Sequence, residues 1–77
     1  MRNYSLCDME KGDFARIEEI KTKGALKQRL FDLGFVKGTK VKCVRTSPLG
    51  DPKAFLIRGS VIALRSEDSS KILGVKI

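Results

Sequence analysis

The sequence predicts a mainly β fold, namely a small, partly open β-barrel of about five strands with one α-helix inserted after the first strand. Five short apolar runs are separated by glycine, proline and other turn residues. One further segment spaces its leucines as a helix does. The third and fourth apolar runs are hydrophobic on both faces, which suits strands covered on both sides. The 77 residues are expected to form a single domain, 1–77, because so short a chain supports one core.

The first strand is predicted over residues 14–20. Ala15 and Ile17 alternate with charged neighbours, a pattern typical of a strand with one buried face. Ile20 breaks this alternation. We therefore expect a β-bulge near Glu18 and Glu19.

The helix is predicted from about Lys23 to Leu33. Thr22 is a candidate N-cap. Gly34 lies where a left-handed residue ends a helix, and Phe35 is placed to fold back on the last turn, at Leu30. The face that packs on the barrel is expected to carry three leucines with i, i+4, i+7 spacing, namely Leu26, Leu30 and Leu33.

Turn residues divide the rest of the chain into short elements. A turn is predicted over residues 36–39, a stiff loop over 47–52 and a tight hairpin turn over 58–60. Ser66 is a candidate cap for a single helical turn over residues 66–69. Four further strands are expected, in order through Val41 and Cys43, over residues 54–57, over residues 61–64, and through Leu73, Val75 and Ile77.

Histidine is absent and cysteine occurs twice. The chain thus lacks the commonest general base and metal ligand, and every His-dependent hydrolase or zinc pattern is excluded. Glycine-rich nucleotide motifs are missing as well. We therefore expect no enzyme, no cofactor and no resident metal. Cys7 and Cys43 cannot complete a four-ligand site without carboxylates, and Cys43 is expected in the core.

The longest stretch without a charged residue covers residues 59–64. A membrane-spanning helix needs about twenty apolar residues, so this chain is not expected to span a bilayer. No apolar stretch of signal-peptide length follows Arg2. We therefore expect a cytoplasmic protein and a monomer, with its cysteines unpaired in a reducing compartment.

Sixteen Lys and Arg residues against nine Asp and Glu give a net charge of +7. This excess favours an anionic partner such as nucleic acid, an anionic membrane surface or an acidic protein, although charge also serves solubility alone. The densest basic group is Lys37, Lys40 and Lys42. Nucleic-acid surfaces combine such residues with exposed aromatic rings. Because Phe14, Phe35 and Phe55 are expected in or near the core, we expect no nucleic-acid partner.

The whole chain, from about Leu6 to Ile77, also resembles a known family. The resemblance is carried by residues in a fixed order: Leu6, Gly12, Ala15, Ile17 and Ile20; Leu33-Gly34-Phe35, Gly38 and Val41; Pro48-Leu49-Gly50-Asp51-Pro52; and Ile57-Arg58-Gly59 leading into Ile62-Ala63-Leu64-Arg65. With these residues the sequence resembles the FeoA family, small cytoplasmic proteins of ferrous iron transport.

The resemblance implies an SH3-like barrel carrying one extra helix. It also implies a non-catalytic accessory or adaptor protein that binds and modulates the GTP-driven ferrous iron permease FeoB. The alternative is a small basic barrel that binds nucleic acid or acts as a metal-dependent regulator, since the family fold recurs in iron-dependent repressors.

The loop over residues 48–52 is the first candidate partner-binding site. Two prolines restrict the backbone on both sides of a glycine, and a stiff loop loses little entropy on binding. The alternative is a purely structural connection in which Asp51 caps its own turn. The candidate residues are Pro48, Leu49, Gly50, Asp51 and Pro52.

The second candidate is Phe31, with Lys27 one turn before it. On a helical wheel Phe31 lies well off the leucine stripe, so a helix packed by that stripe leaves the ring exposed beside a cation. Such aromatic residues are enriched at interface hot spots. The alternative is that the N-terminal segment around Tyr4 and Leu6 covers Phe31.

Overall fold

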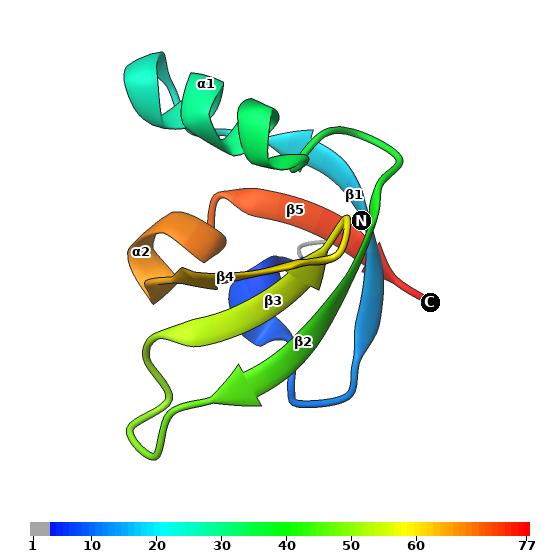
Figure 1. Ribbon diagram of the computed structural model, residues 1–77, viewed down its shortest axis with the longest axis vertical. Coiled ribbons are helices and arrows are strands. Elements are labelled where there is room, and N and C mark those ends of the chain that lie inside the picture. The colour runs from blue at the N-terminus through cyan, green and yellow to red at the C-terminus, as the bar shows by residue number, and fades with distance from the viewer. Residues whose placement is uncertain (1–3) are drawn as a thin grey trace.

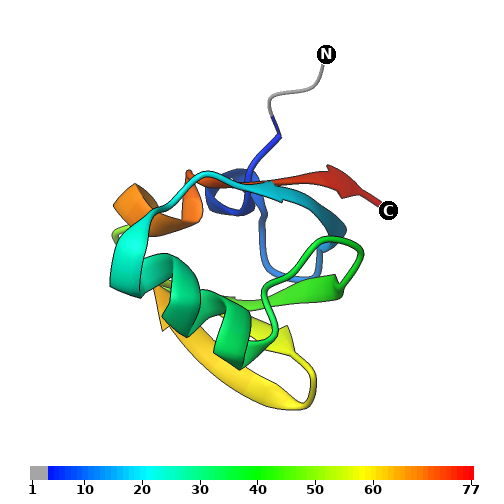
Figure 2. The same ribbon diagram turned by 90° about the horizontal axis from the view of Figure 1, so that it is seen from above.

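One curled antiparallel sheet of five strands dominates the computed structural model, which describes residues 4–77 (Figures 1 and 2). The elements in chain order are η1 (Leu6–Asp8), β1 (Phe14–Ile20), α1 (Gly24–Leu33), β2 (Lys40–Thr46), β3 (Lys53–Ile57), β4 (Ser60–Leu64), α2 (Ser66–Ser69) and β5 (Ile72–Lys76). The strand order is β4-β3-β2-β1-β5, so β4 and β5 are the two edges and the barrel is partly open. α1 lies over one end of the sheet (Figure 1). The predicted fold class is confirmed.

The inward face of the central strands follows the predicted alternation. Ala15, Ile17 and Cys43 are fully buried, and Val41 is nearly so. The register of β1 against β5 shifts between Ile17 and Glu19, which confirms the predicted bulge. The core is completed by Leu6, Met9, Ile20, Leu30, Phe35, Phe55, Ile57, Leu64 and Ile72.

α1 ends as predicted but begins differently. Gly34 adopts a φ of 109°, and the N–H of Phe35 donates to the Leu30 carbonyl at 2.9 Å, which closes the last turn. The N-cap is Lys23, not Thr22, and it makes no side-chain cap bond. The prediction of a threonine cap is wrong, because Thr22 is buried and its hydroxyl donates to and accepts from no group of the described residues.

The burial of side chains in the two edge strands differs from the expected pattern. Val61 of β4 is 57% exposed, so the prediction of two covered faces fails for β4. In β5 the inward residue is Ile72, whereas Val75 points outward. Gly74 explains this register, because a Cβ there would lie 2.7 Å from the carbonyl oxygen of Arg16.

The N-terminal segment packs into the barrel, which the sequence pattern does not predict. Leu6 and Met9 are fully buried. Lys53 of β3 holds this segment from the other side of the core, since its Nζ donates to the carbonyl oxygens of Cys7 at 2.8 Å and Met9 at 2.6 Å. The side chain of Tyr4 packs against the core as well.

Candidate functional site

The exposed aromatic ring on α1 is the first candidate contact. Phe31 is 41% exposed, and Lys27 Nζ lies 5.7 Å from the centroid of its ring. The expectation that Phe31 faces outward is confirmed. The alternative, in which Tyr4 and Leu6 cover the ring, is wrong, because Leu6 is fully buried in the core and Phe31 stays exposed.

An apolar groove opens on another face of the same helix, between α1 and the edge strand β4. Leu30 is buried as predicted, but Leu26 and Leu33 are only partly buried, so the leucine stripe is not fully covered. The space between the two elements measures about 420 Å³. We call it the α1–β4 groove; its lining comprises Leu26, Arg29, Leu30, Leu33, Val61, Ile62, Ala63 and Leu64. The sequence pattern misses this groove because it predicts a closed leucine face.

The loop over residues 47–52 is held together by its own side chains. Ser47 Oγ accepts the N–H of Asp51 and donates to the Asp51 carbonyl, both at 2.9 Å. The Asp51 carboxylate accepts the N–H of Ser66 at 2.8 Å and the Ser66 hydroxyl at 3.1 Å. Asp51 therefore caps α2, and the predictions that Ser66 is this cap and that Asp51 caps its own turn are both wrong. Leu49, at the tip of the loop, is 93% exposed.

The two predicted contact regions do not meet. Phe31 and Lys27 lie on α1 at one end of the barrel, whereas the loop between β2 and β3 lies at the opposite end (Figure 1). The two regions therefore form separate surfaces.

A third feature lies on the outer face of β1 and β2. Phe14, expected in or near the core, is only half-buried, and it pairs across the strands with Lys42. Lys40 Nζ and Lys42 Nζ lie 4.9 and 5.3 Å from the centroid of its ring. The expectation fails because Phe14 shares its side of β1 with the exposed Arg16, opposite the buried Ala15.

Both cysteines are free thiols. Cys43 is fully buried, as expected, and burial raises the pKa of its thiol. Cys7 is half-buried, with Sγ 3.2 Å from the Ser5 hydroxyl. Within residues 4–77, no three His, Cys, Asp or Glu side chains gather as metal ligands do. The helices of the same range are all too short or too polar to span a bilayer.

Known proteins are similar to this chain in sequence and fold. The FeoA domain profile matches residues 4–76. A fusion protein of Fe(2+) transport protein A and Fe(2+) transporter FeoB from Porphyromonas gingivalis is 34% identical over 67 residues, which are 87% of this chain and 8% of that protein. This chain thus spans a small part of that relative.

Solved structures of similar proteins superpose over almost the whole chain. The FeoA protein from Chlorobium tepidum is 31% identical, with a TM-score of 0.87 over 100% of this chain and 70% of that one. FeoA from Stenotrophomonas maltophilia, described as an SH3 domain protein complexed with zinc, is 27% identical, with a TM-score of 0.80 over 91% of this chain and 87% of that one. Family profile and fold agree, so the chain belongs to the FeoA family, SH3-like accessory proteins of ferrous iron transport.

Proposed function

We propose that this protein is a cytoplasmic, monomeric and non-catalytic adaptor that binds the ferrous iron permease FeoB and modulates its transport. The observation that carries the proposal is the fusion of a similar sequence to FeoB in a single chain of P. gingivalis. Joining two proteins raises their effective concentration for each other, which is useful only where the two act together.

The surfaces best suited to this contact are the α1–β4 groove and, on another face of the same helix, the exposed ring of Phe31. The groove is apolar and partly open, and an exposed aromatic ring beside a lysine stands on the same helix. An interface needs such a well-packed apolar centre with a polar rim. Arg29 supplies a cation at the rim of the groove, and Lys27 supplies one beside Phe31.

The edge of β4 adds a second means of recognition. Its outer N–H and C=O groups pair with no other strand among residues 4–77. A partner segment can add itself there as a further strand, with its side chains in the groove. The loop tip at Leu49 is the rival contact at the other end of the barrel.

The proposal is tested by measuring the affinity of the full chain for detergent-solubilised FeoB. Val61→Glu places a charge at the groove, and the 57% exposure of Val61 keeps the fold intact. We expect binding to weaken at least about tenfold. The matched control is Val75→Glu on the opposite sheet edge, where the side chain is 39% exposed and binding should be unchanged.

Leu49→Glu tests whether FeoB binds instead at the loop, at the other end of the molecule. Equal affinity for the wild type, Val61→Glu and Val75→Glu, with a loss in Leu49→Glu, would move the interface to the loop. No binding of the wild-type protein to FeoB in any detergent or nucleotide state would refute the proposed partnership itself.

A further inference from the structure

The outer face of β1 and β2 carries cations that no acidic side chain neutralises. Arg16 and Lys40 lie opposite each other in the register, as do Phe14 and Lys42. Among residues 4–77 the ion pair found is the one between Lys76 Nζ and Asp13 Oδ1, at 3.7 Å, so these three cations have no carboxylate partner. We call Phe14, Arg16, Lys40 and Lys42 the β1–β2 basic face.

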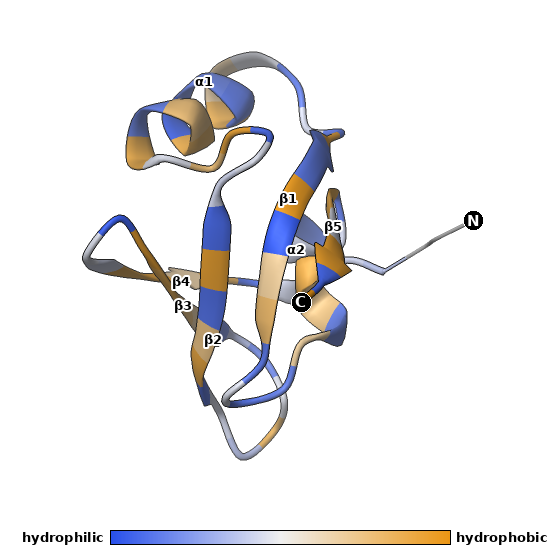
Figure 3. Cartoon of the chain, turned by 90° about the vertical axis from the view of Figure 1, so that its right-hand side faces the viewer, coloured by the Kyte–Doolittle hydropathy of each residue, from blue (hydrophilic) through white to orange (hydrophobic). Residues whose placement is uncertain are grey.

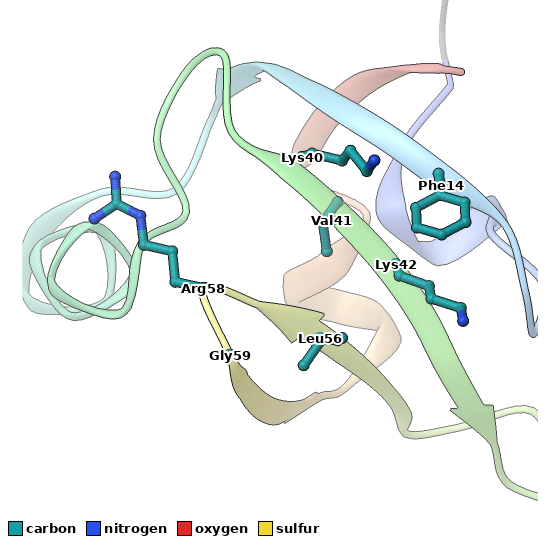
Figure 4. A pocket seen from close by; sticks show the side chains of 7 residues that line it. All are labelled: Phe14, Lys40, Val41, Lys42, Leu56, Arg58 and Gly59. Carbon is teal, nitrogen blue, oxygen red and sulfur yellow. The ribbon is translucent and has the colours of Figure 1, made fainter.

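Two ammonium groups converge on a single ring within this face. Lys40 Nζ and Lys42 Nζ both lie over Phe14, attracted by the negative face of the ring. Beside them is a shallow cavity of about 170 Å³, which Leu56 and Arg58 also line (Figure 4). Two like charges held together repel each other, and an anion placed between them removes that repulsion.

The setting of this face restricts which anion fits. β1 and β2 are paired on both of their edges, so the face offers no free backbone groups to which a peptide strand could add. The lysines already cover the ring of Phe14, so it is not free to stack on a base. What remains is a set of spaced cations on a sheet surface. Figure 3 shows the hydrophilic positions that alternate with hydrophobic ones along β2.

We propose that the β1–β2 basic face contacts the phosphate headgroups of an anionic lipid bilayer. Headgroup phosphates require only nearby cations, without backbone pairing or base stacking. The acidic residues Glu18 and Glu19 lie at the bulged end of β1, which limits the contact to the stretch around Lys40 and Lys42.

This inference rests on the proposed function, because a partner of a membrane permease works next to the bilayer. The α1–β4 groove lies on the far side of β3 from the basic face, so both surfaces are available at once. A few cations hold a protein on a bilayer only weakly. Combined with docking on the permease, the weak contact raises the effective concentration of the adaptor at its target.

The test is co-sedimentation of the full chain with vesicles in the absence of FeoB. We expect binding to phosphatidylcholine vesicles containing roughly 30% phosphatidylglycerol, little binding to pure phosphatidylcholine, and release at about 0.5 M NaCl. The double variant Lys40→Gln/Lys42→Gln should bind about thirtyfold more weakly, since each cation near such a surface contributes about fivefold.

The matched control is Lys21→Gln/Lys71→Gln, which also removes two positive charges. These two lysines are exposed, and the N–H of Lys21 donates a hydrogen bond to the Lys71 carbonyl at the other end of β1. Binding of this control variant should fall less than about threefold. An equal loss in both double variants, or equal binding to neutral and anionic vesicles, would overturn the proposal. So would binding to a single-stranded oligothymidylate that is tighter than binding to the vesicles at the same salt and depends on Lys40 and Lys42, because nucleic acid would then be the ligand.

A separate measurement distinguishes this inference from the proposed function. In detergent, without lipid, Lys40→Gln/Lys42→Gln should bind FeoB as tightly as the wild type does. A failure of the vesicle experiment leaves that result unchanged, and a failure to bind FeoB leaves the vesicle result unchanged.

Discussion

The carboxylate of Asp51 accepts the backbone N–H of Ser66 at 2.8 Å, and so caps a helical turn fifteen residues further along the chain. The same carboxylate accepts the Ser66 hydroxyl at 3.1 Å. The loop between β2 and β3 is thereby fastened to α2. Its rigidity has this cause in addition to its two prolines.

Asp51→Ala should destabilise the protein by about 0.5–2 kcal/mol, the usual cost of removing a helix cap. Urea unfolding measures this change in the free energy of unfolding. Ser66→Ala is the matched control, because it removes only the hydroxyl partner and keeps the N–H bond. If Asp51→Ala cost no more than Ser66→Ala, Asp51 would not be the cap.

Leu30→Ala should cost about 2–5 kcal/mol, because the side chain is 1% exposed and its removal leaves a cavity in the core. Leu33→Ala, on the same helix but only partly buried beside the groove, should cost less. Both values come from denaturant midpoints. Equal losses would mean that the groove is closed in solution.

Phe31→Ala should leave the free energy of unfolding within about 1 kcal/mol of the wild type, because the ring is 41% exposed. The same variant should bind FeoB about thirtyfold more weakly, a loss of about 2 kcal/mol typical of an interface hot spot. Calorimetry on the folded variant gives both quantities. Unchanged affinity would exclude Phe31 from the interface.

Gly74→Ala should destabilise the protein more than Gly38→Ala does. A Cβ at Gly74 would lie 2.7 Å from the backbone oxygen of Arg16, and neither strand can move without loss of pairing. At Gly38 a Cβ meets open space and only the φ of 91° is strained, at about 1–2 kcal/mol. Thermal unfolding of the two variants compares their losses of stability. A smaller loss for Gly74→Ala than for Gly38→Ala would show that the backbone of β5 shifts to accommodate the added Cβ.

Local patterns predict most of the secondary structure, because the residues that decide it are neighbours in the chain. The alternation of Ala15 and Ile17 and the helix stop at Gly34 are of this kind. The burial of Leu6 and Met9 is not, because it depends on Lys53, which is more than forty residues away. No periodicity encodes such a contact.

The candidate site is predicted in part for the same reason. The helical wheel alone correctly predicts that Phe31 is exposed. Predicting the groove requires knowing where β4 lies relative to α1, and this depends on the order of strands in the sheet. Predicting the basic face requires knowing on which side of the sheet Phe14 lies. A single aromatic residue at the start of a strand does not indicate that side.

The outer edge of β4, which pairs with no other strand among residues 4–77, makes the cellular concentration of this protein important. An exposed strand edge that carries apolar side chains pairs with any similar edge it meets, including that of a second copy. With FeoB as the proposed partner, molecules in excess of that partner are the ones at risk of self-association. A gene that encodes both proteins as one chain, as in P. gingivalis, fixes their stoichiometry at one to one and leaves no excess.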